Sequence, residues 1–194
     1  MIPPTIDPRT SALLVMDFQT AAVEMVPADK EGLLARTAML VEGARSAGMS
    51  VLYVVVGFRA GYPELSPRNQ VFGPIRGTGR FAEGSAGMEV HAAVAPKPGE
   101  VVVTKHRASA FFGTDLDMIL RANGIETLVL AGILTSGVVL STVRHAADAD
   151  YRLVVVEDCC ADRDAEVHRV LMEKVFTRWT TVLKAADLFA RAAP

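Results

Sequence analysis

The sequence predicts an α/β fold: a doubly wound, mostly parallel six-stranded sheet with helices on both faces, in a Rossmann-like three-layer arrangement. Six short apolar runs are continuous rather than alternating, which is typical of strands buried on both faces of a parallel sheet. Helical patterns separate several of these runs, and two of the patterns end at a glycine. Because parallel crossovers are nearly always right-handed, the helices are expected on both sides of one open sheet.

The expected elements follow one another in order along the chain. Strands are expected at residues 12–18, 50–58, 100–105, 127–133, 152–158 and 180–185. Helices are expected at 29–48, at 113–124, at 165–179 and after the turn in GILTSGVVLST, residues 132–142. Residues 57–99 are rich in Gly and Pro, and only 87–95 has the pattern of a short helix. Because this long excursion returns directly into a strand, it is expected to form one wall of a pocket.

Length, composition and charge limit the class of protein. A chain of 194 residues with 51% hydrophobic and 22% charged residues predicts one packed domain over residues 1–194. A net charge of −2 without a basic block argues against nucleic-acid binding and a polybasic membrane anchor. No apolar stretch reaches about 18 residues, and the N-terminal segment lacks the pattern of a secretory signal. We therefore expect a cytoplasmic protein whose partner is a small molecule, with no membrane and no nucleic acid involved.

Two residues of opposite charge follow buried runs. Asp17 follows the first run and Lys105 ends the third, so both are expected at the carboxyl edge of the sheet, where open α/β sheets bind ligands. Taken singly, the aspartate is typical of a turn and the lysine of a solvated surface. If the two meet in a cleft, each stabilises the ionised form of the other, and both become candidates for proton transfer.

A third candidate element is the turn from the fourth run into a helix. Thr135, Ser136 and Gly137 provide small residues and backbone N–H groups at a helix start, which can bind an anion or a developing oxyanion. The alternative is that Thr135 or Ser136 simply caps the helix. Ser136 is a weak candidate for a nucleophile, because the local sequence lacks the G-x-S-x-G context.

In their order along the chain, these pieces resemble the isochorismatase-like cysteine hydrolase family. The matching pieces are D-F-Q, K-H-R-A-S-A-F-F-G-T-D-L, A-G-I-L-T-x-x-x-V-x-x-T and an aspartate after the fifth run, and they span about residues 11–185. The resemblance implies a triad of aspartate, lysine and cysteine, whose first two members fall on Asp17 and Lys105. The cysteine position, three residues after the threonine, is Val138. The usual nucleophile is therefore missing.

The loss of the cysteine leaves two functional hypotheses. A valine side chain cannot form an acyl intermediate, so amide hydrolysis by the family route is not expected. Family members that hydrolyse the vinyl ether of isochorismate also lack this cysteine, and the resemblance implies that their aspartate acts as a general acid while water attacks the cation. We therefore expect a hydrolase of a small, anionic molecule with Asp17 as general acid. This role requires burial of Asp17 to outweigh the charge of Lys105. The alternative is a non-catalytic ligand-binding or scaffold protein.

Family position and chemical type suggest further substrate-binding residues. A planar or apolar substrate would pack on aromatic side chains, and a carboxylate would bind guanidinium groups; the candidates are Phe18, Phe72, Phe111, Arg59 and Arg107. Core packing and solvated surface are the respective alternatives. No cofactor and no metal are expected, because the sequence GFRAGYPELSPRN lacks the clustered His and Asp that related nicotinamidases carry after the second strand.

Two expectations concern the cysteines and the assembly. Cys159 and Cys160 are adjacent, so they are expected to be free thiols and not a disulfide. They are expected to pack as small buried hydrophobic residues and not to replace the missing nucleophile. A homodimer or larger homo-oligomer is expected from the resemblance. The helix after Ser136 is the expected contact, with its residues Val139, Leu140, Val143, Arg144 and His145.

Overall fold

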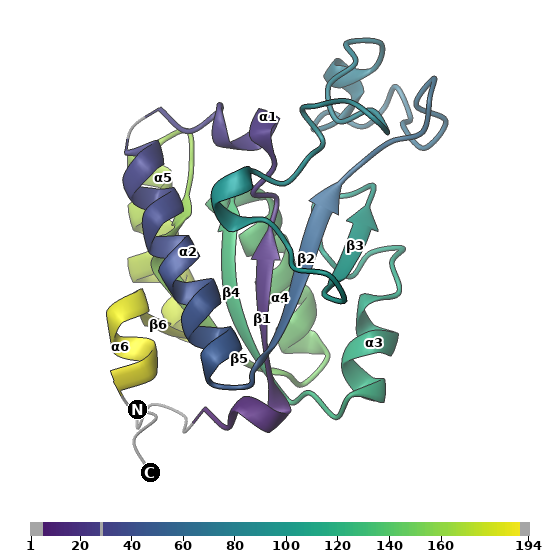
Figure 1. Cartoon of the computed structure of the whole chain (residues 1–194). Coiled ribbons are helices and arrows are strands. Elements are labelled where there is room, and N and C mark those ends of the chain that lie inside the picture. The colour runs from purple at the N-terminus through teal and green to yellow at the C-terminus, as the bar shows by residue number, and fades with distance from the viewer. Residues whose placement is uncertain (1–5, 28, 191–194) are drawn as a thin grey trace.

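Six parallel strands form the centre of the molecule in a computed structural model, which describes residues 6–27 and 29–190 (Figure 1). The strand order is β3-β2-β1-β4-β5-β6, and every neighbouring pair is parallel. The strands are β1 (Ser11–Met16), β2 (Ser50–Val56), β3 (Val101–Lys105), β4 (Thr127–Ile133), β5 (Arg152–Ala161) and β6 (Thr181–Leu183). The predicted doubly wound α/β fold is confirmed, and the sheet is parallel throughout. The direction of winding reverses between β1 and β4.

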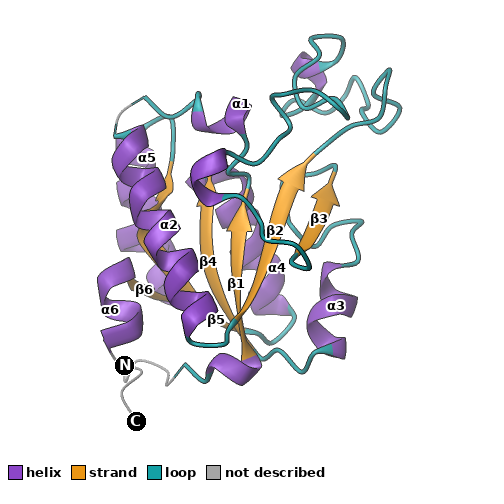
Figure 2. Cartoon of the chain, viewed as in Figure 1, coloured by secondary structure: helices purple, strands orange, loops and turns teal. Residues whose placement is uncertain are grey.

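Helices cover both faces of this sheet (Figure 2). They are α1 (Thr20–Val23), α2 (Lys30–Ser46), α3 (Leu116–Ala122), α4 (Leu140–Asp148), α5 (Ala165–Val170) and α6 (Ala185–Ala190). The helix expected at 165–179 is divided: α5 gives way to a wide π-type turn at Leu171–Val175 and a 3-10 turn at Phe176–Arg178. The sequence did not predict α1 and α6, because each is too short to show helical periodicity.

Alternation along each strand creates one hydrophobic core on each face of the sheet. Leu13 and Val15 of β1 pack into the core beneath α2 and α6. Ala12 and Leu14 of the same strand pack into the other core, with α3, α4 and the segment after α5. All six residues of β1 are buried, which explains why its sequence is apolar from Ala12 to Met16.

The long excursion between β2 and β3 contains no α-helix. Its described regular structure consists of 3-10 turns at Gly73–Ile75 and Ala92–Val94, so the helix expected at 87–95 is reduced to three residues. The side chain of Gln19 fixes this loop over the carboxyl edge of the sheet. Its Nε2 donates to the carbonyls of Val56 and Met88, both at 2.8 Å, and its Oε1 accepts from the N–H of Val56 at 2.9 Å. The glutamine after Asp17 and Phe18 thus has a structural role.

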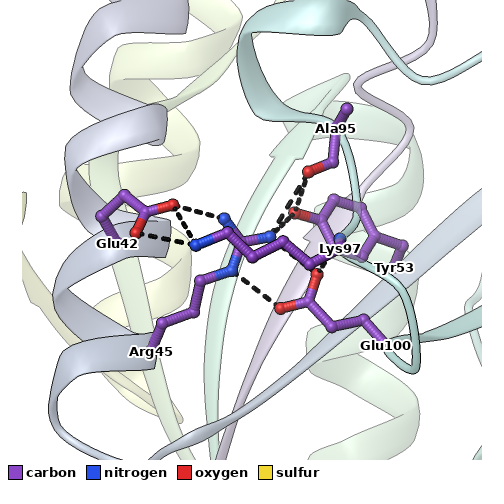
Figure 3. A network of polar contacts seen from close by, with 6 residues as sticks. All are labelled: Glu42, Arg45, Tyr53, Ala95, Lys97 and Glu100. Atoms are coloured by element: carbon purple, nitrogen blue, oxygen red, sulfur yellow. Dashed lines mark hydrogen bonds and ion pairs between the residues drawn. The ribbon is translucent and has the colours of Figure 1, made fainter.

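A polar network joins the returning end of this loop to α2 (Figure 3). Arg45 donates to both carboxylate oxygens of Glu100, at 2.8 and 2.7 Å, and to Glu42 at 2.6 Å. It also donates to the hydroxyl of Tyr53 at 3.2 Å and to the carbonyl of Ala95 at 3.3 Å. The Arg45 and Glu100 side chains are only 15% and 16% exposed, so this forked pair is shielded from solvent.

Replacing Arg45 by Met is expected to lower the free energy of unfolding by about 2–4 kcal/mol, because a shielded Glu100 carboxylate loses its partner. Arg45 holds the pKa of Glu100 below its ordinary value. A lowered acid pKa stabilises the fold above the unfolded pKa, and this stabilisation is lost as pH falls through the folded pKa. The difference in unfolding free energy between the wild type and the variant should therefore become smaller as the pH falls to about 3, which is below the ordinary pKa range of carboxyl groups. Urea unfolding at several pH values measures this difference.

The matched control for this variant is Arg152→Met. Arg152 pairs with Glu126 at 3.1 Å, but the two side chains are 64% and 60% exposed. Exposed pairs of this kind contribute about 0–1 kcal/mol, so the control should unfold almost like the wild type. Equal losses in the two variants would contradict a special role for the Arg45 network.

Candidate active site

The two charged residues at the carboxyl edge form an ion pair. The Nζ of Lys105 lies 2.9 Å from Oδ2 of Asp17, and it also donates to the carbonyl of Arg107 at 3.1 Å. The side chains are 1% and 10% exposed, respectively. Lys105 ends β3 and Asp17 follows β1, so the pair reaches across the end of β2, which lies between these strands.

The environment of Asp17 favours the protonated carboxyl group. Burial raises the pKa of Asp17, while the charge of Lys105 opposes this effect and only reduces it. Among the described residues, Oδ1 of Asp17 has no hydrogen-bond partner. The backbone of Asp17 has φ 57°, a left-handed conformation that is uncommon outside glycine and tends to occur at functional sites. The upward shift of the Asp17 pKa is the direction that a general acid requires.

Asp17 and Lys105 line a cavity of about 120 Å³ at the point where the winding of the sheet reverses. Most of the wall is apolar, and it comes from six parts of the chain. The segment after β1 contributes Ala22 and Met25, β2 and the segment after β3 contribute Val56 and Ala108, the excursion contributes Val71, Phe72, Ile75, Arg80 and Phe81, and the carboxyl side of the sheet adds Ile133, Leu134, Gly137, Val138 and Arg163. The excursion thus forms a wall of the cavity.

The turn between β4 and α4 presents Val138 to this cavity. It is a π-type turn over Thr135–Val139, and Val138 is buried in it. The N–H of Ser136 donates to Oδ2 of Asp162 at 2.6 Å, and the N–H of Gly137 donates to the carbonyl of Leu134 at 3.1 Å. These two N–H groups are already occupied, which differs from the expectation that they bind an anion.

Side chains on this turn have structural contacts. The hydroxyl of Thr135 lies 2.8 Å from Nδ1 of His168, while Ser136 is exposed. Neither residue lines the cavity. Thr135 instead joins the turn to His168 in α5, and Ser136 contacts Asp162 through its backbone N–H.

Four other residues expected to bind substrate lie away from the cavity. Phe18 is buried in the core beneath α2, and Phe111 stacks on His145 with ring centroids 4.7 Å apart. Arg59 pairs with Glu64 at 2.6 Å. Arg107 donates to the carbonyls of His106 and Glu64, at 2.6 and 3.0 Å. Of the predicted binding residues, the structure therefore brings only Phe72 and Gly137 to the cavity wall.

Several lining residues were not anticipated from the sequence. Arg163 follows β5 at the carboxyl edge, so the reasoning that identified Asp17 could also have found it. Arg80 and Phe81 lie inside the excursion, where no periodic pattern indicates which side chains point inward. Ala22 and Met25 belong to the short segment around α1.

The cysteines do not reach the Asp17 cavity. Both are buried free thiols in β5, which extends three residues beyond the predicted strand. Burial raises the pKa of Cys159 to about 12 and raises that of Cys160 as well, so both stay protonated at neutral pH. Neither therefore has the position or the ionisation of a replacement nucleophile.

The described ranges contain neither a metal-binding cluster nor a helix suited to a membrane. Across residues 6–27 and 29–190, no group of three or more His, Cys, Asp or Glu side chains is arranged to hold a metal ion. In the same ranges, no helix combines the length and the apolar character that crossing a bilayer requires.

Comparison with known proteins places this geometry in a family. The isochorismatase domain matches residues 11–187. The ureidoacrylate amidohydrolase RutB of Variovorax paradoxus is 35% identical, covering 94% of this chain and 81% of its own. The maleamate amidohydrolase of Pseudomonas putida is 31% identical, with 92% and 85% covered. The crystal structure of a cysteine hydrolase from Pseudomonas syringae pv. phaseolicola has the same fold, with a TM-score of 0.87 at 24% identity over 98% of both chains. The chain belongs to the isochorismatase family of hydrolases.

Proposed function

We propose that this protein hydrolyses a small anionic molecule with Asp17 as general acid and without a cysteine nucleophile. The observation that carries the proposal is the buried carboxyl group of Asp17, with its raised pKa and an oxygen that lacks a partner among the described residues. A general acid must hold its proton until the substrate takes it, and burial supplies that property. Lys105 then stabilises the carboxylate that remains after proton transfer.

A vinyl ether such as isochorismate fits this chemistry. Asp17 transfers its proton to the terminal vinyl carbon, and the positive charge is shared between the neighbouring carbon and the ether oxygen. Water adds to that carbon and releases a proton, and the resulting hemiketal collapses to a ketone and an alcohol. No side chain has to form a covalent bond in this sequence. The direct test is to incubate the purified chain with isochorismate and to measure pyruvate, the ketone product.

Amide hydrolysis through an acyl-enzyme is not expected for this chain. Two relatives are named amidohydrolases. We infer from the family pattern in the sequence that Val138 occupies the position of the nucleophilic cysteine in this chain. A hydrocarbon side chain cannot attack a carbonyl carbon. The native protein should therefore leave simple amides intact.

Val138→Cys is expected to create a reactive thiol, because residue 138 lines the cavity that also contains Lys105. Acylation by an activated ester such as p-nitrophenyl acetate should exceed that of the wild type by on the order of tenfold or more, since a thiolate is a strong nucleophile. Mass spectrometry of the intact protein would locate the acyl group.

Val139→Cys is the matched control for this gain. Val139 is fully buried in the core and does not line the cavity, so its thiol should stay unmodified. Equal acylation of the two variants, or none in either, would contradict the placement of residue 138 as the nucleophile position.

The competing proposal is a non-catalytic ligand-binding protein, and Val138 is the observation that favours it. It predicts measurable binding of small anions and no turnover in a wide substrate screen. The retained ion pair of Asp17 and Lys105 favours the enzyme, because a binding pocket alone gives no reason to keep a buried proton donor beside a cation.

We further infer a cytoplasmic protein in which residues 1–194 act as one domain and assemble as a homodimer or larger oligomer. The expected contact helix needs correction in part: Val139 and Val143 are buried in their own core, whereas Arg144 and His145 are exposed. Arg144 lies over the ring of Trp179, 4.5 Å from its centroid. Light scattering of the purified chain tests the assembly.

A further inference from the structure

We propose that Arg80 and Arg163 together bind the carboxylate of the substrate at the mouth of the Asp17 cavity. The proposal deepens the proposed function by assigning the substrate class, a compact apolar body with a carboxylate at one end. As a statement about binding it can be tested separately from turnover.

The positions of the two arginines place them at the solvent side of the cavity. Both line it, and both are exposed. Asp17, Lys105 and Val138 line the same cavity and are buried, so they form its inner end. A ligand that reaches the carboxyl group of Asp17 with one end therefore lies with its other end near the guanidinium groups.

Neither guanidinium is neutralised within the described part of the chain. Arg80 has no side-chain hydrogen bond or ion pair there, and Arg163 contacts only Sδ of Met25, a weak acceptor. Arg59, which the sequence suggested for this role, is instead paired with Glu64. Both cations at the cavity therefore keep free hydrogen-bonding capacity.

The charge of the lining favours an anion. It holds three basic side chains, Lys105, Arg80 and Arg163, against one acidic side chain, Asp17. Burial raises the pKa of Asp17, so this carboxyl group neutralises less positive charge than an ordinary aspartate would. A positively charged cavity in a chain of net charge −2 attracts small anions, and planar guanidinium forks match carboxylate oxygens.

Backbone contacts fix both arginines relative to the site. The carbonyl of Arg80 accepts from the hydroxyl of Tyr62, and its N–H donates to Oγ1 of Thr78, both at 3.1 Å. Arg163 follows Asp162, whose carboxylate holds the N–H of Ser136 on the turn that carries Val138. The cations therefore come from anchored segments, which reduces the entropy lost on binding.

The test is calorimetric titration of the whole chain with benzoate and with benzamide, which has nearly the same shape but no charge. Benzoate should bind the wild type more tightly. Arg80→Gln and Arg163→Gln should each weaken benzoate binding by about tenfold, the usual effect of a charged hydrogen bond, and leave benzamide unchanged. Arg80→Lys should restore part of the loss, because it keeps the charge without the fork. Arg76→Gln is the control, since Arg76 is an exposed residue of the same loop outside the cavity lining.

The proposal is overturned if benzoate shows no measurable binding, if it binds no more tightly than benzamide, or if the Arg80 and Arg163 variants bind it like the wild type. Urea unfolding of each variant establishes that the fold is retained. If benzoate binding depends on the two arginines but isochorismate is not hydrolysed, the proposed reaction is contradicted and the carboxylate site is supported. If isochorismate is hydrolysed but benzoate binding does not depend on the arginines, the reaction is supported and the carboxylate site is contradicted.

Discussion

Replacing Asp17 by Asn is expected to reduce turnover of a confirmed substrate by about 100-fold or more, the usual contribution of a general acid. Asparagine keeps the shape of the side chain but has no proton of comparable acidity to transfer. Steady-state release of the ketone product measures the effect. The loss should appear mainly in kcat, because the proton moves only in the transition state.

The control for this variant is Asp148→Asn, an exposed aspartate at the end of α4 outside the cavity lining. It makes the same chemical change and should leave turnover as in the wild type. Unchanged turnover in Asp17→Asn would exclude Asp17 as the acid. Equal losses in the two variants would indicate a non-specific effect.

The same mechanism has a pH signature. Activity that requires protonated Asp17 is full below its pKa and falls as pH rises through it. Because burial raises this pKa, the fall in kcat/KM should occur above the range of an ordinary aspartate. Profiles of kcat/KM against pH for the wild type measure it, and a fall within the ordinary aspartate range would contradict a proton held by burial.

The sequence predicted the sheet well because a strand that is buried on both faces has a continuous run of apolar residues. Strand β1 is apolar from Ala12 to Met16 and β4 from Leu128 to Ile133, so neither resembles an amphipathic helix. The end of β5 was harder to predict. Its pairing with β4 shifts register between Leu130 and Gly132, and the half-buried Glu157 and Asp158 lie beside that irregularity. The expected strand ended at residue 158, although β5 continues to Ala161.

The cavity was only partly predictable because sequence position does not determine side-chain direction. The rule that ligands bind at the carboxyl edge identified Asp17 and Lys105, which lie at the ends of regular strands. Phe18 is next to Asp17 in sequence, yet it points into the core. Within the excursion, Arg59 and Arg80 have similar chemistry, but pairing with Glu64 occupies only Arg59. Such differences depend on contacts between residues distant in sequence.

Replacing Lys105 by Met is expected to lower the free energy of unfolding at neutral pH by about 3–5 kcal/mol, the usual result of removing one partner of a buried ion pair. Methionine keeps much of the volume of the lysine stem, so packing changes little. Asp17 would remain buried without its cation, and its pKa would rise further above the ordinary value. Urea unfolding at several pH values measures the loss.

The dependence of this loss on pH separates charge from packing. An acid whose folded pKa is raised stabilises the fold fully below its unfolded pKa, and this contribution is lost as pH rises through the folded pKa. The deficit of Lys105→Met should therefore be smallest near pH 4, roughly the unfolded aspartate pKa, and should grow toward pH 8. Adding Asp17→Asn removes the buried acid, so the double variant should recover much of the stability at pH 8 and lose this pH dependence. A deficit equal at both pH values, or a double variant as unstable as Lys105→Met, would show that Lys105 acts through packing and not through the charge of Asp17.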